Sequence, residues 1–99
     1  MDMVVEFQTA CFDCVQKCLE QIATMQITVE KQALVNEMGK CSLICLAAAR
    51  GALGGTAIPA TIDRCKEACL RLANMCERSD EVEAYRPLLA ALQTCIDAL

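Results

Sequence analysis

Nine cysteines among 99 residues constrain this chain more than any other feature. Eight of them recur at intervals of three, four or seven residues, and the ninth stands alone near the end. Residues at these spacings lie on one face of an α-helix. The sequence therefore predicts several helices whose inward faces carry thiols. The three groups and the lone residue are Cys11, Cys14 and Cys18; Cys41 and Cys45; Cys65, Cys69 and Cys76; and Cys95.

The remaining composition favours an all-α fold. Hydrophobic residues make up 56 % of the chain, yet only Phe7, Phe12 and Tyr85 are aromatic. A core of Leu, Ile, Val, Ala, Cys and Met favours helices over strands. The length suits one domain and is too short for two, so residues 1–99 are expected to form a single domain.

Periodicity and turn signals divide the chain into four expected helices. The first three span about residues 4–25, 29–52 and 56–78, with Thr28 and Thr56 as candidate N-caps. The fourth begins either at a capping box at Asp80 or nearer Tyr85, because Pro87 would otherwise lie deep inside it. Four such helices with short loops predict an antiparallel up-down-up-down bundle.

Antiparallel folding also predicts which side chains share a level. Reflecting each helix onto the next about its loop sets Cys14 near Cys41. Reflection about Gly54 sets Cys65 between the levels of Cys41 and Cys45, and the next reflection sets Cys95 level with Cys65. Six cysteines therefore gather in one half: Cys11, Cys14, Cys41, Cys45, Cys65 and Cys95. Cys18 and Cys69 are expected at the inner boundary of this half, close to Met38. The other half collects Met25, Leu34, Leu72, Tyr85, Leu88 and Leu92, with Cys76 almost alone among them. The prediction is a polarised core with a thiol-lined end.

Convergence of thiols points to a soft metal. One buried free cysteine usually packs as a small hydrophobe, but six in one half exceed what packing requires. Zinc sites usually use CxxC knuckles in loops, and here the one CxxC, Cys11/Cys14, lies on a helix. The chain has no histidine, and iron–sulfur clusters are usually held by loops. Cu(I) accepts two or three thiolates, which makes it the expected metal and all nine cysteines its candidate ligands.

Three segments resemble a known family. The pattern CxxCxxxC from Cys11 to Cys18, the Cys41/Cys45 pair before an alanine-rich segment, and Cys65/Cys69 with Leu72 and Cys76 are similar to the bacterial copper storage proteins. That resemblance implies a cytosolic, non-catalytic, homotetrameric four-helix bundle that stores or buffers many Cu(I) ions. The family usually carries further cysteines at positions that are aliphatic here, so the resemblance implies a lower capacity. The ions are expected to enter at an open thiol end.

A second hypothesis remains open. Cys41/Cys45 and Cys65/Cys69 form a twin CxxxC pattern, similar to small mitochondrial chaperones in which two disulfides pin one helix to the next. That alternative leaves five cysteines unexplained and requires a shorter spacer than this chain has. Alkylation of the protein without reductant separates the two hypotheses, because the disulfide form has at least four blocked thiols.

Several function classes are disfavoured. An enzyme is not expected, because the chain lacks a histidine to activate a nucleophile and a phosphate-binding glycine loop. A net charge of −4 and a pI of about 4.7 argue against nucleic acid or an acidic membrane as partner. The odd cysteine count and the lack of a basic, apolar leader indicate reduced thiols and a cytoplasmic location.

Overall fold

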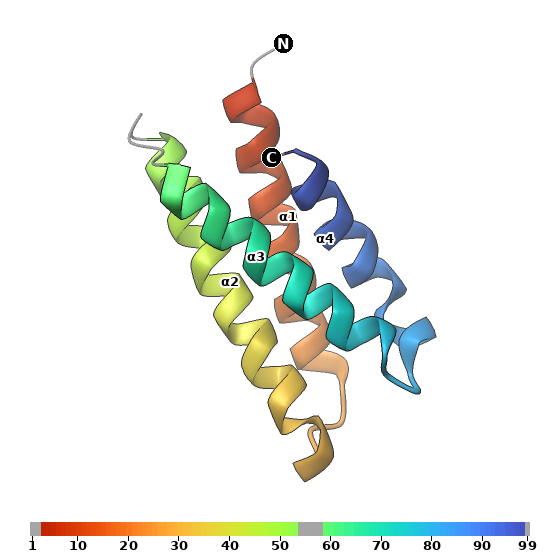
Figure 1. Ribbon diagram of the computed structural model, residues 1–99. Helices are drawn as coiled ribbons and strands as arrows, with labels where there is room; N and C mark the ends of the chain where they lie inside the picture. The colour runs from red at the N-terminus through yellow and green to blue at the C-terminus, as the bar shows by residue number, and fades with distance from the viewer. Residues whose placement is uncertain (1–2, 54–58, 99) are drawn as a thin grey trace.

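The computed structural model describes residues 3–53 and 59–98 and confirms the all-α four-helix bundle (Figure 1). Its four α-helices are α1 (Met3–Thr24), α2 (Gln32–Leu53), α3 (Pro59–Glu77) and α4 (Arg86–Asp97). Two 3-10 turns, η1 (Val29–Lys31) and η2 (Val82–Tyr85), precede α2 and α4. Consecutive helices run antiparallel and pack side by side, and α4 returns to pack against α1.

The predicted helix limits are close to those found. The second helix begins three residues later than expected, because Val29–Lys31 form a 3-10 turn whose N-cap, Thr28, makes no side-chain capping hydrogen bond. The fourth helix begins near Tyr85, with Pro87 in its first turn, where proline is tolerated. The expected N-cap Thr56 lies outside the described residues.

Each helix buries one stripe of side chains at intervals of three or four residues. On α1 the stripe consists of Phe7, Cys11, Cys14 and Cys18, and on α3 of Cys65, Cys69, Leu72 and Cys76. On α2 it includes Leu34, Met38, Cys41 and Cys45, and on α4 Leu88, Leu92 and Cys95. Complete burial of a leucine-sized side chain stabilises a fold by about 1.5–3 kcal/mol, so these stripes hold the bundle together.

The two ends of the bundle are closed in different ways. At the end near η1 and η2, Lys31 forms a 2.6 Å ion pair with Glu81, and the Tyr85 hydroxyl donates to the same carboxylate at 3.5 Å. At the opposite end, Phe7, Ala48 and Ala49 are buried one turn beyond the nearest cysteines of α1 and α2. None of the described helices is both long enough and apolar enough to cross a membrane.

Candidate metal centre

All nine cysteines are buried free thiols, and seven of them form one network. Every one of the nine side chains is at most 1 % exposed. The seven, here called the thiol network, are linked by sulfur–sulfur distances of 3.5–4.0 Å: Cys11, Cys14, Cys41, Cys45, Cys65, Cys69 and Cys95. The network lies at the end of the bundle that Phe7, Ala48 and Ala49 close. The sequence therefore predicted the thiol-lined half correctly.

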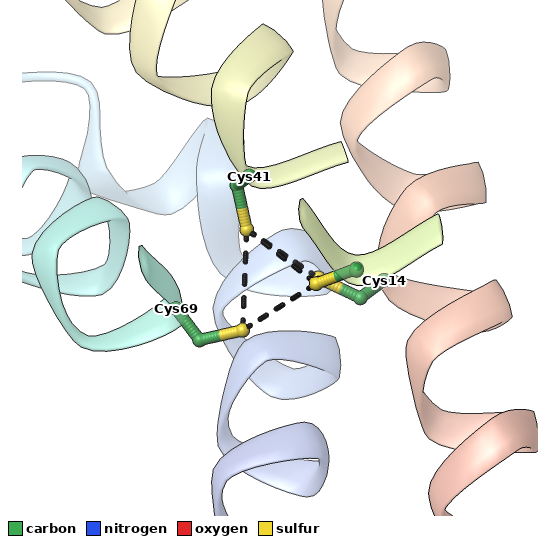
Figure 2. Close-up of side chains that lie close together, drawn as sticks. Cys14, Cys41 and Cys69 are labelled. Carbon is green, nitrogen blue, oxygen red and sulfur yellow. Dashed lines mark hydrogen bonds between the residues drawn. The ribbon is translucent and has the colours of Figure 1, made fainter. Parts of the chain in front are cut away.

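Three sets of sulfur atoms form nearly equilateral triangles, which we call the thiol triangles. The edges are 4.0, 3.9 and 3.9 Å for Cys14/Cys41/Cys45. They are 3.9, 3.9 and 3.8 Å for Cys41/Cys45/Cys69. Figure 2 shows the Cys14, Cys41 and Cys69 side chains converging from α1, α2 and α3 on one region of the core.

The third triangle, Cys11/Cys65/Cys95, has edges of 3.9, 3.9 and 4.0 Å and joins α1, α3 and α4. The shortest distance in the network, 3.5 Å between Cys45 and Cys65, connects it to the other two. An ion at the centre of any triangle would lie about 2.3 Å from each sulfur, the length of a metal–thiolate bond. The three triangles are therefore already spaced for three-coordinate binding.

Two overlapping groups of four thiols could also hold an ion. They are Cys14/Cys41/Cys45/Cys69 and Cys45/Cys65/Cys69/Cys95, and within each the sulfurs all lie within 4.8 Å of one another. The groups share Cys45 and Cys69. Ions bound in both would therefore be bridged through common thiolates.

Cys69 lies deeper in the network than predicted. Reflection about Gly54 placed Cys65 opposite Cys41 and Cys45 and left Cys69 at the boundary. In the structure Cys69 is 3.9 Å from Cys41, and Cys65 is 3.5 Å from Cys45. The α2–α3 register is thus shifted by about half a turn of helix from the prediction. The predicted neighbours Cys14/Cys41 and Cys65/Cys95 are both confirmed at 4.0 Å.

Two cysteines lie outside the thiol network. Cys18 borders the network as predicted, and hydrogen bonds from the thiols of Cys14 and Cys41 lower the pKa of Cys18. Ser42, which donates to the Met38 carbonyl at 2.9 Å, also interacts with Cys18. Cys76 lies apart, and burial raises its pKa to about 12. Cys76 is therefore the weakest of the nine candidate ligands.

Hydrogen bonds among the thiols shift their pKa values in opposite directions. Hydrogen bonds to Cys45, Cys65 and Cys95, together with burial, raise the pKa of Cys11. Hydrogen bonds to Cys18 and other neighbours likewise raise the pKa of Cys14. Hydrogen bonds from Cys11 and other neighbouring thiols lower the pKa of Cys95. Thiolates are the metal-binding form, so metal ions that enter this network must displace its thiol protons.

The expected open thiol end is wrong for the described residues. Phe7 is 6 % exposed, and Ala48 and Ala49 are 2 % and 0 % exposed. They continue the buried stripes of α1 and α2 beyond Cys11 and Cys45, and the Gln8 side-chain amide donates to the Ala49 carbonyl at 3.5 Å. This closure was not predicted from the sequence, although Phe7 falls four residues before Cys11 on the same helical face.

Among the residues that the structure describes, no positive charge in the core compensates charge on the thiolates. Ser42 is the one buried side chain of the described residues that is polar, and it carries no charge. An apolar environment strongly disfavours a net charge that is neither paired nor solvated. The thiol network therefore favours an occupant whose positive charge balances the thiolate charge.

No protein-family model, curated protein or solved structure matches this chain. The interpretation of the centre therefore depends on its own geometry and chemistry. These define a buried polythiol centre that could bind soft metal ions within an all-helical bundle.

Proposed function

We propose that this protein binds several Cu(I) ions through the cysteine thiolates of its core and stores or buffers them. The observation that carries the proposal is the three thiol triangles, whose 3.8–4.0 Å edges suit trigonal coordination by sulfur. Cu(I) is a soft ion that thiolates select, and the chain offers no histidine for a mixed site.

Charge balance favours Cu(I) over divalent zinc. A Zn²⁺ ion held by four thiolates carries a net charge of −2, and no buried cation stands ready among the described residues to offset it. One Cu(I) per thiolate leaves a neutral core. Bridging through shared residues such as Cys45 lets each thiolate serve more than one ion while this ratio is kept.

The biological setting is part of the same proposal. Thiolates must stay reduced to bind Cu(I), which suits the cytoplasm. The resemblance of Cys11–Cys18 and the later cysteine pairs to the copper storage proteins supports a storage role without catalysis, in a homo-oligomer that would be a tetramer by that resemblance. Seven or eight converging thiols support a smaller capacity than a core lined with cysteine throughout.

An anaerobic titration of the reduced protein with Cu(I), against a chromophoric chelator, tests the proposal. We expect several ions per chain for the wild type and a clear loss of capacity for Cys41→Ser/Cys45→Ser, because these two residues belong to both α2-containing triangles. Cys76→Ser is the matched control and should retain the full capacity. Retention of one ion or none by the wild type refutes storage.

The disulfide-pinned alternative also has a specific observation in its favour. Cys41 faces Cys69 at 3.9 Å and Cys45 faces Cys65 at 3.5 Å, which is the pairing that a twin CxxxC motif needs between two helices. The Cys11/Cys65/Cys95 triangle is unexplained by that pairing. Alkylation before and after reduction decides: nine reactive thiols in the unfolded, unreduced protein support metal storage, whereas five support the disulfide protein.

A further inference from the structure

The triangle of Cys11, Cys65 and Cys95 differs from the other two thiol triangles because it shares no cysteine with them. Its sulfur atoms come from α1, α3 and α4 and are 3.9, 3.9 and 4.0 Å apart. The other two triangles have Cys41 and Cys45 in common, so they compete for these thiols. The thiol network therefore divides into one independent set of three thiols and one set of four.

An ion that binds alone in the independent triangle must balance the charge of three thiolates by itself. A monovalent ion leaves a net charge of −2 there, and a divalent ion leaves a net charge of −1. A monovalent ion reaches neutrality in this triangle only when further ions bridge its thiolates. Because an apolar core strongly disfavours an unpaired charge, the triangle favours a trivalent ion, which makes it neutral at once.

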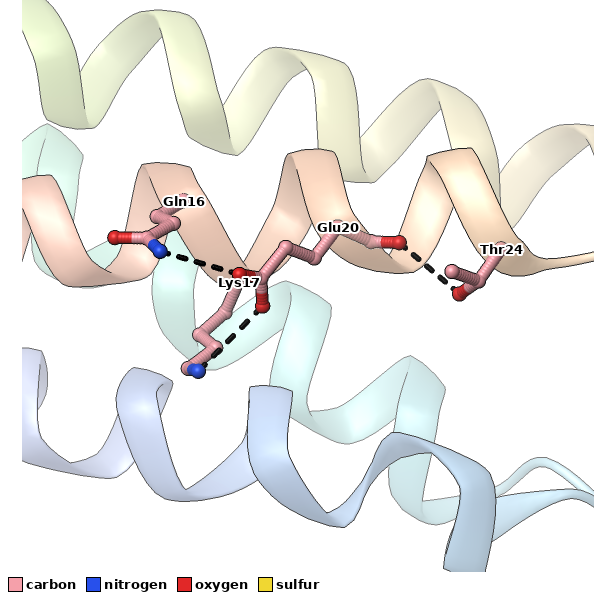
Figure 3. Close-up of polar contacts among 4 residues, drawn as sticks. All are labelled: Gln16, Lys17, Glu20 and Thr24. Carbon is pink, nitrogen blue, oxygen red and sulfur yellow. Dashed lines mark hydrogen bonds and ion pairs between the residues drawn. The ribbon is translucent and has the colours of Figure 1, made fainter.

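The cationic side chains that adjoin cysteines in the sequence do not supply this balance. Lys17 of α1 is 34 % exposed, and its ammonium group lies 3.5 Å from the Glu20 carboxylate (Figure 3). Lys40 of α2 is 66 % exposed, and its ammonium group lies 3.8 Å from the Glu37 carboxylate. Among the residues that the structure describes, no lysine or arginine is buried. The bound ion must therefore bring the charge that neutralises the thiolates.

Trivalent arsenic combines this charge with softness and a coordination number of three. As(III) binds three thiolates, which select soft ions, in a trigonal pyramid: As(OH)₃ + 3 RSH gives As(SR)₃ + 3 H₂O. Three As–O bonds break and three As–S bonds form, each thiol proton leaves as water with one hydroxide, and no electron is transferred. The pyramid would draw the sulfurs of the triangle closer, towards the 3.5 Å that Cys45 and Cys65 already show.

The closed thiol end also suits the dissolved form of this ion. Phe7, Ala48 and Ala49 are buried beyond the nearest cysteines of α1 and α2 and close that end. A hydrated cation loses much of its solvation when it crosses an apolar layer. Arsenous acid, As(OH)₃, carries no net charge at neutral pH, so its entry costs less.

We infer that this protein binds trivalent arsenic, taken up as arsenous acid, with one As(III) in the Cys11/Cys65/Cys95 triangle and a second in the set of four thiols. The inference rests on the reduced thiols that the proposed function also needs, but not on Cu(I). Two ions are the geometric limit, because one network thiol is left over and Cys18 and Cys76 lie outside the network. Nine cysteines would permit three ions by number alone.

Native mass spectrometry of the reduced full chain with sodium arsenite tests the inference. An excess of a monothiol keeps the cysteines reduced and competes with weak sites. We expect two arsenic atoms per chain, each with the loss of three protons, and X-ray absorption at the arsenic edge should show three sulfur neighbours and no oxygen. A wild type that binds no arsenic or three atoms, or that retains oxygen neighbours, overturns the inference.

Two double variants that each keep seven thiols locate the sites. Cys65→Ser/Cys95→Ser should bind one arsenic atom, because it removes the independent triangle. Cys18→Ser/Cys76→Ser is the matched control and should still bind two, with the helix content of both variants checked by circular dichroism. Equal binding by the two variants overturns the assignment. Retention of Cu(I) without arsenic refutes this inference alone, whereas retention of arsenic without Cu(I) refutes copper storage alone.

Discussion

The two halves of this bundle use the same helices and solve the same packing problem with different side chains. Near η1 and η2 the core is filled by Leu34, Met38, Leu72, Tyr85 and Leu88, each at most 8 % exposed. In the other half the equivalent stripes carry the thiol network. The aliphatic half shows that ordinary side chains fill this architecture well. The sulfur atoms in the thiol half are therefore better explained by ligand chemistry than by packing.

The largest effect that we expect from this difference is a rise in thermal stability when the protein binds Cu(I). Ions in the thiol triangles would join α1, α2 and α3 through Cys14/Cys41/Cys69 and add α4 through Cys95. Saturating a site at about a thousand times its Kd stabilises by about 4 kcal/mol, and each kcal/mol raises Tm by about 4–8 °C in a domain of this size. We expect Tm to rise by more than about 20 °C, measured by anaerobic thermal circular dichroism.

Amide hydrogen exchange on the loaded protein sharpens this prediction. Protection should increase most around Cys41 and Cys45 and least around η2, because the ions would bind in one half only. Equal protection of both halves would show that the stabilisation is not localised at the thiols.

The next largest effect separates packing from binding. Leu88→Ala removes a side chain that is 1 % exposed, and such a change costs about 2–5 kcal/mol. Its Cu(I) capacity should stay at the wild-type value. Cys14→Ala deletes a single sulfur atom, so it should cost only about 1 kcal/mol in the apo protein but lower the capacity. Urea unfolding together with the chelator titration measures both quantities for each variant.

The opposite pattern of Cu(I) capacities in these two variants would contradict the division of the core into an aliphatic half and a thiol half. A Leu88→Ala protein that loses bound copper would place ligands in the aliphatic half. A Cys14→Ala protein with unchanged capacity would remove Cys14 from the binding set.

A smaller effect concerns the isolated thiol of Cys76. Burial raises its pKa from 9.0 to about 12 in the folded protein. Between these values the unfolded chain has lost this proton and the native chain keeps it, so stability falls as pH rises and does not change below about pH 9 through this group. Cys76→Ala should make the decline shallower by about 1.4 kcal/mol per pH unit, which is the contribution of one proton.

Urea unfolding of the apo protein at intervals between pH 9 and pH 12 measures the difference. The Cu(I) titration of the same variant serves as the control and should be unchanged, since Cys76 belongs to neither group of four thiols. Parallel pH dependences for the two proteins would show that Cys76 is ionised or accessible to water in the folded state.

Much of the fold could be predicted from the sequence, because the helical period of the cysteines is also the period of the buried stripes. The limits of α1 and the proline in the first turn of α4 followed from the same local rules. The register between α2 and α3 could not be predicted in this way, because a change of one or two residues in the connecting loop shifts every pair of facing residues on the two helices. That shift brings Cys69 beside Cys41.

Closure of the thiol end was missed for a different reason. The predicted stripes were defined by cysteine spacing and so did not include Phe7, Ala48 and Ala49, although the spacing of these residues continues the same helical faces. The exposure of Val5, Phe12 and Leu19 on α1 was likewise not predicted, since it can be judged only when the neighbouring helices are in place. Local periodicity identifies which faces are apolar, whereas tertiary packing decides which apolar face is buried.

The smallest predicted effect concerns Gly39, which lies in the interior of α2. Gly39→Ala should stabilise the chain by up to about 1 kcal/mol, because alanine is the better helix former and its Cβ meets no neighbour. The midpoint of urea unfolding at constant slope measures this change. A loss of stability would mean that the chain itself approaches Gly39. The expected gain would mean that packing within the bundle does not require a glycine at this position, in contrast to the buried stripes on either side of it.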